Sequence, residues 1–396
     1  MAKGRARKCE ILVINNIAQV GLKRFPQEQY SLVKEASDPQ AILVRSQDLH
    51  KYEFGPSLRA VGRAGAGVNN IPVAALSKRG VPVFNAPGAN ANAVKELVLA
   101  GMLIAARNLA PALDFVRQLK DEDLEAKVED GKKQFAGSEL PGHTLGVIGL
   151  GKIGSLLADA AIRLGMNVQG YDPHITVEAA WSLPSQVKRA ASIDELIKTS
   201  HFVSLHVPLG EKTRNLINGK NVEYFRNGAV LLNFSREGIV AEDAVLKGLK
   251  GHHLRWYVTD FPTGELLGHP GVIALPHLGA STREAEDNCA IMVSDQVRDY
   301  LEHGNLQNAV NFPEAVMPRE APYRLAIANA NVPDMLGSIS HALGRRKINI
   351  HNMLNKSRGE MAYTLVDADS PVPVEVTREL AGLNGVLSVR YLPADA

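Results

Sequence analysis

The chain has 396 residues, of which 45% are hydrophobic and 22% are charged. These values exclude a disordered, collagen-like or small disulfide-rich protein, and the length predicts two or three globular domains. The 44 Lys and Arg residues nearly balance the 42 Asp and Glu residues, so no overall basic charge indicates nucleic-acid binding.

The cysteine content and the apolar runs indicate where in the cell the protein is expected. Cys9 and Cys289 are the only cysteines, which favours a reducing, cytoplasmic location. The longest apolar run, residues 93–106, contains Lys95 and Glu96, so no membrane span is expected. The basic residues 1–8 are expected to form a solvated tail rather than a nucleic-acid-binding arm.

The first part of the chain alternates short apolar runs with turns and helical stretches. Residues 10–14, 41–44 and 80–85 are predicted to be strands, and residues 93–107 a long buried helix. This order of elements is typical of a parallel sheet covered by helices.

A second α/β region follows from about residue 144. The predicted strands are residues 145–148, 167–171, 201–206, 230–233 and 272–274. Residues 281–303 are predicted to form an amphipathic helix, and residues 304–318 a linker.

The last part of the chain has a different pattern. Its predicted strands are residues 323–330, 349–355, 360–367 and 386–392, and its predicted helices are residues 335–343 and 373–383. The resulting β-α-β-β-α-β order indicates a ferredoxin-like domain.

The strongest local signal is the sequence Gly-Leu-Gly-Lys-Ile-Gly at residues 149–154, directly after a predicted strand and before a predicted helix. In a dinucleotide-binding loop, Gly149 would form the tight turn and Gly151 would let the backbone approach the pyrophosphate. Gly154 would let the helix pack close to the strand. The amino end of the helix would add partial positive charge for the anion.

An acidic residue is expected at the end of the next strand of such a unit. Asp172 ends the predicted strand 167–171 and lies 23 residues after Gly149. Its carboxylate would accept hydrogen bonds from the ribose hydroxyls and would repel a 2′-phosphate, which favours NAD over NADP.

Two further strand ends carry groups that suit hydride-transfer chemistry. His277 follows the predicted strand 272–274, and Glu265 precedes it by twelve residues, close enough through a loop to orient the imidazole. Such a pair would accept a hydroxyl proton. Arg236 follows the predicted strand 230–233, where its guanidinium would bind a substrate carboxylate or, alternatively, form a surface salt bridge.

Together these motifs resemble the D-2-hydroxyacid dehydrogenase family over nearly the whole chain. Residues 62–71 resemble the family's first substrate loop, with Asn69 where Asp is usual, and Asn85-Ala-Pro precedes the interdomain helix. The other matching motifs are residues 149–154, 206–209 with Thr213, 233–236, 260–265 and 276–282. Many members have Phe-Pro-x-Glu, whereas here Gly264 adds one residue before the glutamate.

The resemblance assigns roles to individual residues. It implies that Arg236, Glu265 and His277 are catalytic. The implied cofactor contacts are Gly149, Gly151, Lys152, Ile153, Gly154, Asp172, His206, Val207, Pro208, Thr213, Phe234, Ser235, Asp260, Gly279 and Ala280. The implied substrate contacts are Arg45, Ser46, Arg63, Ala64, Gly65, Gly67 and Lys95, of which Arg45, Ser46 and Arg63 would meet a phosphate or carboxylate and Lys95 would assist electrostatically.

The C-terminal unit resembles an ACT domain, a small-molecule sensor attached to enzymes of amino-acid metabolism. Residues 331–336 look like its Asn-x-Pro-Gly-x-Leu turn, with Asp334 replacing Gly. The resemblance places an amino-acid effector such as L-serine at Asn329, Asn331 and Asn349. A purely structural dimerisation unit is the alternative.

The expected architecture is α/β: two Rossmann-like or flavodoxin-like parallel-sheet lobes with a cleft, plus the ferredoxin-like ACT domain. The lobes would comprise residues 1–92 with 281–318, and residues 93–280, which bind NAD; residues 319–396 would form the ACT domain. No metal is expected, and the family implies a homodimer or homotetramer.

The implied reaction is NAD-dependent oxidation of a phosphorylated 2-hydroxy acid, 3-phospho-D-glycerate, to 3-phosphohydroxypyruvate, the first step of phosphorylated serine synthesis. One alternative is a general hydroxypyruvate or glyoxylate reductase, for which Arg45 would matter little. Another is a NAD-sensing scaffold like the carboxy-terminal-binding corepressors.

Overall fold

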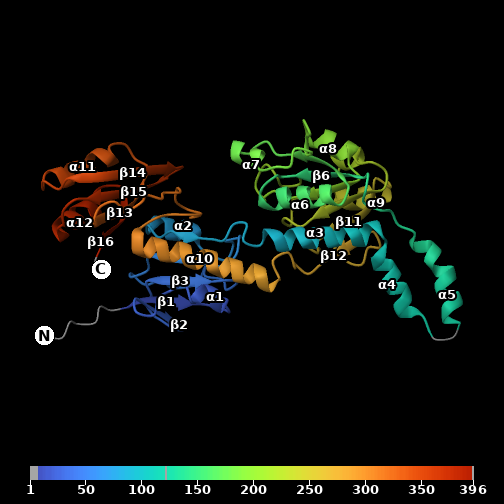
Figure 1. Cartoon of the computed structure of the whole chain (residues 1–396), viewed down its shortest axis with the longest axis horizontal. Coiled ribbons are helices and arrows are strands. Elements are labelled where there is room, and N and C mark those ends of the chain that lie inside the picture. Colours follow the sequence, from blue (N-terminus) through green and yellow to red (C-terminus); the bar gives the residue numbers. More distant parts are fainter. Residues whose placement is uncertain (1–7, 121–122, 395–396) are drawn as a thin grey trace. The chain divides into compact units, whose positions relative to one another are not determined.

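The structure, a computed structural model, describes residues 8–120 and 123–394. The chain forms two compact units, Met1–Asn90 with Arg283–Ala396, and Ala91–Thr282. All but Lys8 of the basic N-terminal segment lies outside the described residues. Figure 1 colours the elements by their place in the chain.

The first unit contains a five-stranded parallel sheet in the order β2-β1-β3-β4-β5, the order of flavodoxin-like folds. Its strands are β1 (Cys9–Val13), β2 (Tyr30–Val33), β3 (Ala41–Val44), β4 (Ala60–Arg63) and β5 (Val83–Phe84). Its helices are α1 (Gln19–Leu22), α2 (Val73–Lys78) and α10 (Arg283–His303). The long helix α10 therefore joins the sheet from far along the chain.

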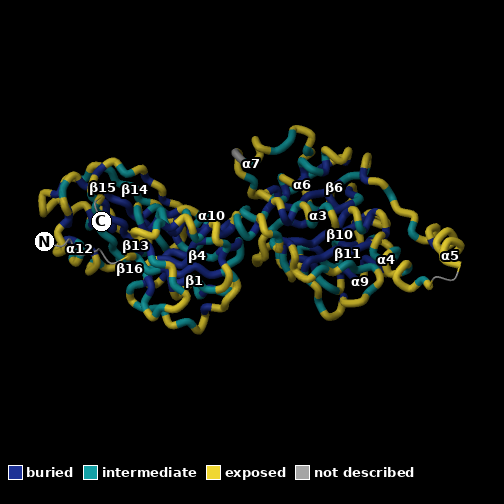
Figure 2. Tube along the Cα trace, turned by 60° about the horizontal axis from the view of Figure 1, so that its bottom comes forward, coloured by how far each residue is buried: buried dark blue, intermediate teal, exposed yellow. Residues whose placement is uncertain are grey.

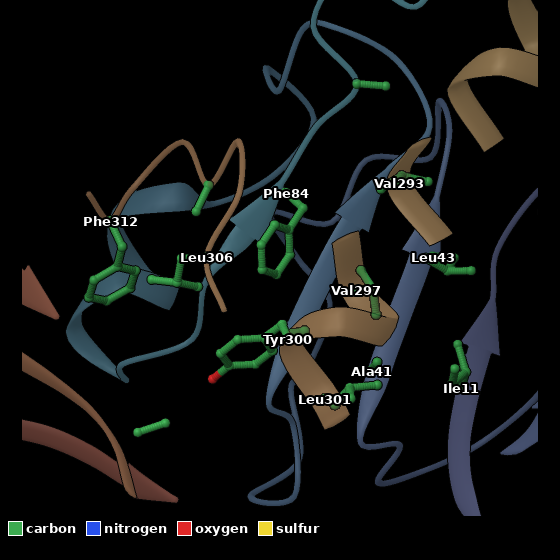
Figure 3. Packing of buried hydrophobic residues seen from close by; sticks show 14 of the residues in the cluster. Ile11, Ala41, Leu43, Phe84, Val293, Val297, Tyr300, Leu301, Leu306 and Phe312 are labelled. Atoms are coloured by element: carbon green, nitrogen blue, oxygen red, sulfur yellow. The ribbon is translucent and has the colours of Figure 1, made fainter. Parts of the chain in front are cut away.

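This sheet is buried on both faces: α10 covers one (Figure 3), and a second cluster that includes Ile42, Val61 and Leu76 of α2 covers the other. Val293 and Val297 are one helical turn apart, so their side chains share a face of α10 and pack with Leu43 of β3. Gly62 of β4 lies under them, and a Cβ there would be 2.8 Å from both valines. The close approach of helix and strand therefore requires glycine at this position.

The second unit contains a seven-stranded parallel sheet in the order β12-β11-β10-β9-β6-β7-β8. This is the Rossmann order extended by one strand. The strands are β6 (Thr144–Ile148), β7 (Asn167–Tyr171), β8 (Lys188–Arg189), β9 (Phe202–Leu205), β10 (Ala229–Asn233), β11 (Leu254–Thr259) and β12 (Val272–Ala274).

Helices cover both faces of this sheet. The helical elements are α3 (Ala91–Ala106), α4 (Leu109–Gln118), α5 (Leu124–Gly131), η1 (Lys132–Phe135), α6 (Lys152–Arg163), α7 (Val177–Trp181), α8 (Ile193–Thr199), η2 (Asn221–Tyr224) and α9 (Glu242–Lys250). Val230 and Leu232 of β10 pack in the cluster that includes α3 and α6, whereas Leu231 packs in the cluster that includes α8 and α9. This alternation is the two-residue period of a strand buried on both sides.

Helices α4 and α5 extend away from the sheet, and much of their surface is exposed (Figures 1 and 2). Leu113 and Val116 of α4 are among the exposed large apolar residues. No single helix of the described chain is long and apolar enough to cross a membrane, although α3 and α4, which bend by 66° at their junction, pass this test as a pair. The buried face of α3 belongs to the core just described.

The C-terminal part of the first unit is the expected βαββαβ domain. It comprises β13 (Tyr323–Ala330), α11 (Met335–Gly344), β14 (Ile350–Arg358), β15 (Met361–Ala368), α12 (Val374–Ala381) and β16 (Val386–Pro393). Its antiparallel sheet has the order β14-β15-β13-β16, which is the ferredoxin-like arrangement.

A buried arginine fixes this domain to the preceding segment. Arg324 is fully buried and donates to the Asp367 carboxylate at 2.6 and 2.9 Å. The same guanidinium donates to the carbonyl oxygens of His303, Met317 and Pro318. Arg324 therefore joins the segment predicted to be a linker, residues 304–318, to β13 and β15.

Most predicted elements are found within two residues of the expected bounds. The strand expected at residues 80–85 is only Val83–Phe84, because glycine, proline and a turn bound it. No range was predicted for strands β2, β4, β8 and β11 or for helices α1, α2, α4, α5, α7, α8 and α9. Small residues in β4 and the two-residue length of β8 hide their pattern, whereas the β-branched and aromatic residues of β11 were a usable signal.

Candidate active site

The glycine loop has the geometry that its sequence predicts. Gly149 has a φ of 92°, and a Cβ on it would lie 2.5 Å from the carbonyl oxygen of His206. A Cβ on Gly154 would collide with the Gly149 carbonyl oxygen. A Cβ on Gly151, at the amino end of α6, would meet nothing within 4 Å. The space in front of Gly151 fits a pyrophosphate at the amino end of a helix.

Asp172 fixes the far side of this loop. One carboxylate oxygen accepts a hydrogen bond from the backbone N–H of Leu150 at 2.9 Å, and the other accepts one from the N–H of His174 at 2.9 Å. The carboxylate thus stands at the end of β7 directly beside the loop. This is the position in which a ribose-binding acid is expected.

The end of β9 carries the half-buried His206. His206 Nε2 is 2.8 Å from the Ser204 hydroxyl, while Nδ1 is buried without a hydrogen-bond partner among the described residues. Burial lowers the pKa of His206 to about 4, so the ring is neutral near pH 7. Val207 and Pro208 follow, and Thr213 closes the turn by donating to the Pro208 carbonyl at 2.6 Å.

The end of β10 holds Arg236 in place. The buried Asn233 side chain donates to the Arg236 carbonyl at 3.0 Å, and the Ser235 hydroxyl donates to the Leu205 carbonyl at 2.5 Å. The half-buried Arg236 guanidinium donates to the Ser235 carbonyl at 2.6 Å and forms no ion pair with any described carboxylate. Its charge is therefore available for an anionic ligand. Phe234 is buried between these residues.

Asp260, at the end of β11, organises the segment that carries His277. Asp260 is 1% exposed, and its two oxygens accept hydrogen bonds from the backbone N–H groups of Leu278 and Gly279, both at 2.7 Å. Its own N–H donates to the Asn233 carbonyl at 3.1 Å. The resemblance assigned Asp260 to the cofactor, but its positioning of this loop was missed. Ala280 follows the same loop.

His277 and Glu265 are not joined by a hydrogen bond in this structure. His277 is exposed, has a φ of 56° and packs against the Phe261 ring with centroids 4.8 Å apart. No hydrogen bond or ion pair joins it to Glu265 among the described residues. Glu265 instead lines a pocket of ≈ 400 Å³ together with Asn233 and Tyr257. The orienting role of Glu265 stays a prediction.

The predicted substrate residues of the first unit form their own network. Arg45 makes an ion pair with Glu286 of α10 at 2.7 Å, and its carbonyl accepts from Arg63 Nε at 3.0 Å. A Cβ on Gly65 would meet the Arg63 guanidinium, so this side chain lies directly against the loop. Ala64, Gly65 and Gly67 complete this loop after β4.

Three asparagines that sequence reasoning did not single out as site residues support this network. Asn15 Oδ1 accepts from the N–H of Ser46 at 3.1 Å. Asn70 donates to the Arg45 carbonyl at 3.4 Å, and Asn85 donates to the Ala66 carbonyl at 2.5 Å. Asn15 has a φ of 67°, a conformation that only the structure reveals. The sequence nevertheless offered a signal, because asparagine directly after a strand is typical of a turn.

Lys95 of α3 already has partners on its own helix. Its ammonium donates to Asn92 Oδ1 at 2.6 Å and lies 3.8 Å from a carboxylate oxygen of Glu96. Within residues 8–120 and 123–394, no group of three or more His, Cys, Asp or Glu side chains could hold a metal ion.

The predicted effector residues lie at two ends of the C-terminal sheet. Asn329 is fully buried, and its Oδ1 has no hydrogen-bond partner among the described residues. Asn331 donates to the Gly359 carbonyl at 3.1 Å. Asn349 donates to Asp369 at 2.5 Å, beyond the opposite end of β15. One chain therefore does not bring the three side chains together.

Comparisons with known proteins agree with this geometry. Residues 99–279 match the family described as D-isomer specific 2-hydroxyacid dehydrogenase, NAD binding domain. The chain is 32% identical over 417 residues to D-3-phosphoglycerate dehydrogenase of Escherichia coli, covering 97% of this chain and 98% of that one. It is 36% identical over 324 residues to D-3-phosphoglycerate dehydrogenase of Methanocaldococcus jannaschii, covering 78% of this chain and 58% of that one.

The chain thus spans little more than half the length of the Methanocaldococcus protein. A crystal structure of NAD⁺-bound 3-phosphoglycerate dehydrogenase from Entamoeba histolytica shares the fold, with a TM-score of 0.61 and 24% identity over 77% of this chain and 99% of that one. The chain therefore belongs to the D-isomer specific 2-hydroxyacid dehydrogenase family, and its second unit contains the NAD-binding domain of that family.

Proposed function

We propose that the protein is an NAD-dependent D-3-phosphoglycerate dehydrogenase, which oxidises 3-phospho-D-glycerate to 3-phosphohydroxypyruvate. The observation that carries the proposal is the sheet order β12-β11-β10-β9-β6. Because these strands are parallel, their carboxyl ends form one edge, which carries His277, Asp260, Arg236, His206 and the glycine loop in neighbouring positions. A dinucleotide loop, a free cation and an exposed imidazole thus share one edge.

The residues of this edge divide the chemistry among them. NAD, when bound, accepts the C2 hydride. The Arg236 guanidinium suits a substrate carboxylate, because its fork-shaped donors match two carboxylate oxygens. His277 would accept the C2 hydroxyl proton as the hydride leaves, and Glu265 would orient His277 and stabilise the resulting imidazolium.

The cationic residues of the first unit support a phosphorylated substrate rather than an unphosphorylated one. Arg45, Ser46 and Arg63, together with the backbone of Ala64, Gly65 and Gly67, supply cations and N–H groups to the anionic ends of the substrate. Arg45 would exchange its ion pair with Glu286 for the ligand, since that pair is partly exposed and therefore weak. Lys95 assists through its charge rather than through a direct contact.

The C-terminal domain is proposed to bind an amino-acid effector, L-serine, between two copies of the chain. The buried, unpartnered Asn329 Oδ1 would accept from the ammonium group. Strand β14 lies at the edge of its sheet, where it could pair antiparallel with β14 of a second copy. In such a pair the start of one β14 lies opposite the end of the other, so Asn349 of the second copy would lie opposite Arg358 of the first. Asn331, bonded to Gly359, lies at that same end. A homodimer or homotetramer follows.

The location proposed is the cytoplasm, since both Cys9 and Cys289 are free. The reaction itself is tested with 3-phospho-D-glycerate carrying deuterium at C2. The proposal predicts that NADH forms and carries one deuterium, measured by mass spectrometry of the recovered nucleotide. The proposed chemistry would be refuted if 3-phospho-D-glycerate with NAD⁺ formed no NADH and 3-phosphohydroxypyruvate with NADH formed no NAD⁺.

A further inference from the structure

The first unit contains a cavity that lies apart from every residue assigned above. It has a volume of ≈ 480 Å³ and lies where β16 packs beside the segments that precede β4 and follow α2. Tyr300 of α10, which Figure 3 shows in the adjoining core, forms part of its wall. Small-molecule sites have volumes of about 300–1,000 Å³. We call it the β16 cavity.

Arg390 of β16 contributes a positive charge that no acid neutralises. Its Nη1 and Nη2 donate to the carbonyl oxygens of Tyr300 and Leu301 at 2.8 and 2.7 Å. Its guanidinium carbon lies 4.5 Å from the centroid of the Tyr300 ring. The Nε–H is buried without a hydrogen-bond partner among the described residues. Neutral partners fix the side chain, but its charge stays uncompensated.

Arg59 and Arg79 place two more guanidinium groups in the same wall. Arg79 donates to the carbonyl oxygens of Phe54 and Gly55 at 3.0 and 2.5 Å. Arg59 is exposed, and its side chain makes no hydrogen bond or ion pair with any described residue. Its pKa is lowered, first because the surrounding protein excludes water and second because Arg390 repels its charge. Arg59 and Arg390 thus lie close enough to repel one another, and an anion bound between them would relieve this repulsion.

The described wall of the cavity contains no carboxylate that could neutralise these three arginines. Among the described residues that line the cavity, none is acidic. Asp38 lies behind Ser57, and its two oxygens accept hydrogen bonds from the Ser57 backbone N–H and hydroxyl at 2.8 and 2.7 Å. An arginine cluster without counterion in a concave site is typical of phosphate recognition, because guanidinium donors match phosphoryl oxygens.

We propose that the β16 cavity binds a small anion with a phosphoryl group, held by Arg59, Arg79 and Arg390. The site is separate from the dinucleotide loop, and the proposal does not depend on the proposed reaction. Arg390 belongs to the C-terminal domain, whereas Arg59 precedes β4 and Arg79 follows α2, so the anion would stabilise the packing of the domain against these segments. Ligands with this chemistry include inorganic phosphate and phosphorylated hydroxy acids.

The test is isothermal titration of the full-length protein with inorganic phosphate, 3-phospho-D-glycerate and D-glycerate, at constant ionic strength set with chloride. The decisive variant is Arg59→Gln, because Arg59 has no partner whose loss would disturb the fold. Phosphate should bind the wild-type cavity, and the variant should lose about tenfold or more in affinity for it, as expected for the loss of a charged hydrogen-bond donor. D-Glycerate should not bind there. A stronger effect with 3-phospho-D-glycerate than with phosphate would identify a phosphorylated acid as the ligand.

Thermal unfolding separates this site from general electrostatic effects. Phosphate should raise the wild-type Tm, whereas Arg59→Gln should have an unliganded Tm no lower than wild type and little response to phosphate. The matched control is Arg358→Gln: Arg358 also donates to backbone carbonyls of the first lobe, Ala309 and Val310, but lies outside the cavity wall. It should lower the Tm and keep the phosphate response. Equal phosphate affinity and equal Tm response in wild type and Arg59→Gln would overturn the proposal, as would absence of binding to the wild type.

Discussion

Asp260 Oδ2 accepts a hydrogen bond from the backbone N–H of Gly279 at 2.7 Å, and its other oxygen accepts one from the N–H of Leu278 at the same distance. The carboxylate at the end of β11 therefore fixes the loop after β12 directly beside His277. A Cβ on Gly279 would lie 3.1 Å from the carboxylate, so the fit is close. Asp260 positions the proposed base through the backbone rather than through the imidazole.

Asp260→Asn tests this role. An amide can accept from only one of the two N–H groups and would direct its own donor at the other. We expect the free energy of unfolding to fall by about 1.5–3 kcal/mol, since a buried charged acceptor is lost, and kcat to fall with it. Urea unfolding and steady-state kinetics measure both. Asp159→Asn, at an exposed ion pair with Arg163, is the control and should leave both unchanged.

His277→Asn tests the proposed base. Asparagine tolerates the left-handed φ of 56° at this position, so the loop should keep its conformation. We expect kcat to fall by about 10²–10⁴-fold, as for loss of general acid–base catalysis, with NADH affinity unchanged by fluorescence titration. His252→Asn is matched, because His252 is exposed with a φ of 59° but precedes β11. Retained turnover in His277→Asn would exclude the role.

Two glycines of the dinucleotide loop should respond differently to the same substitution. Gly151→Ala adds a methyl group into open space, so thermal stability should hold while NADH affinity falls, since the methyl blocks the pyrophosphate. Gly154→Ala should lower the Tm itself, because its Cβ would collide with the Gly149 carbonyl. NADH titration and thermal unfolding distinguish the two. Unchanged NADH affinity in Gly151→Ala would place the pyrophosphate elsewhere.

The lowered pKa of the half-buried His206 predicts a pH dependence of stability. Its pKa is about 4 in the folded chain, against an ordinary value near 6.5. Between these values the unfolded chain binds the proton and the folded chain does not, so stability falls as the pH falls through this window. The loss reaches up to about 3 kcal/mol at pH 4. The pKa of His201 is also lowered by burial, so it adds to the loss in the same direction.

The variant His206→Gln should have a flatter curve of unfolding free energy between pH 6.5 and pH 4 than the wild type. The exposed His341→Gln serves as the control and should reproduce the wild-type curve. Parallel curves for wild type and His206→Gln would show that the imidazole is not buried in its neutral form.

Features encoded within one short segment could be predicted from the sequence. Gly149, Gly154 and Asp172 belong to one β-α-β unit, in which spacing alone sets their geometry, and the structure places them accordingly. The bounds of β13, β15 and β16 were also predicted to within one residue from the hydrophobic pattern.

Features that depend on contacts distant in sequence could not be predicted. The N–H groups that Asp260 binds are 18 and 19 residues away, and nothing in the local pattern marks them. The ion pair of Arg45 with Glu286 joins residues 241 apart. The separation of Asn349 from Asn329 depends on strand register. The two residues lie beside opposite ends of β15, which is eight residues long.

The most direct measurement is NADH-dependent reduction of 3-phosphohydroxypyruvate, hydroxypyruvate and glyoxylate by the full-length protein, each with and without L-serine. The proposed function predicts a kcat/KM for the phosphorylated acid at least about a hundredfold higher than for the others, which corresponds to about 2.7 kcal/mol of transition-state stabilisation from the phosphate contacts. Arg45→Gln should remove most of this preference. Equal or better turnover of the unphosphorylated acids would contradict the account and assign the protein to general hydroxyacid reduction.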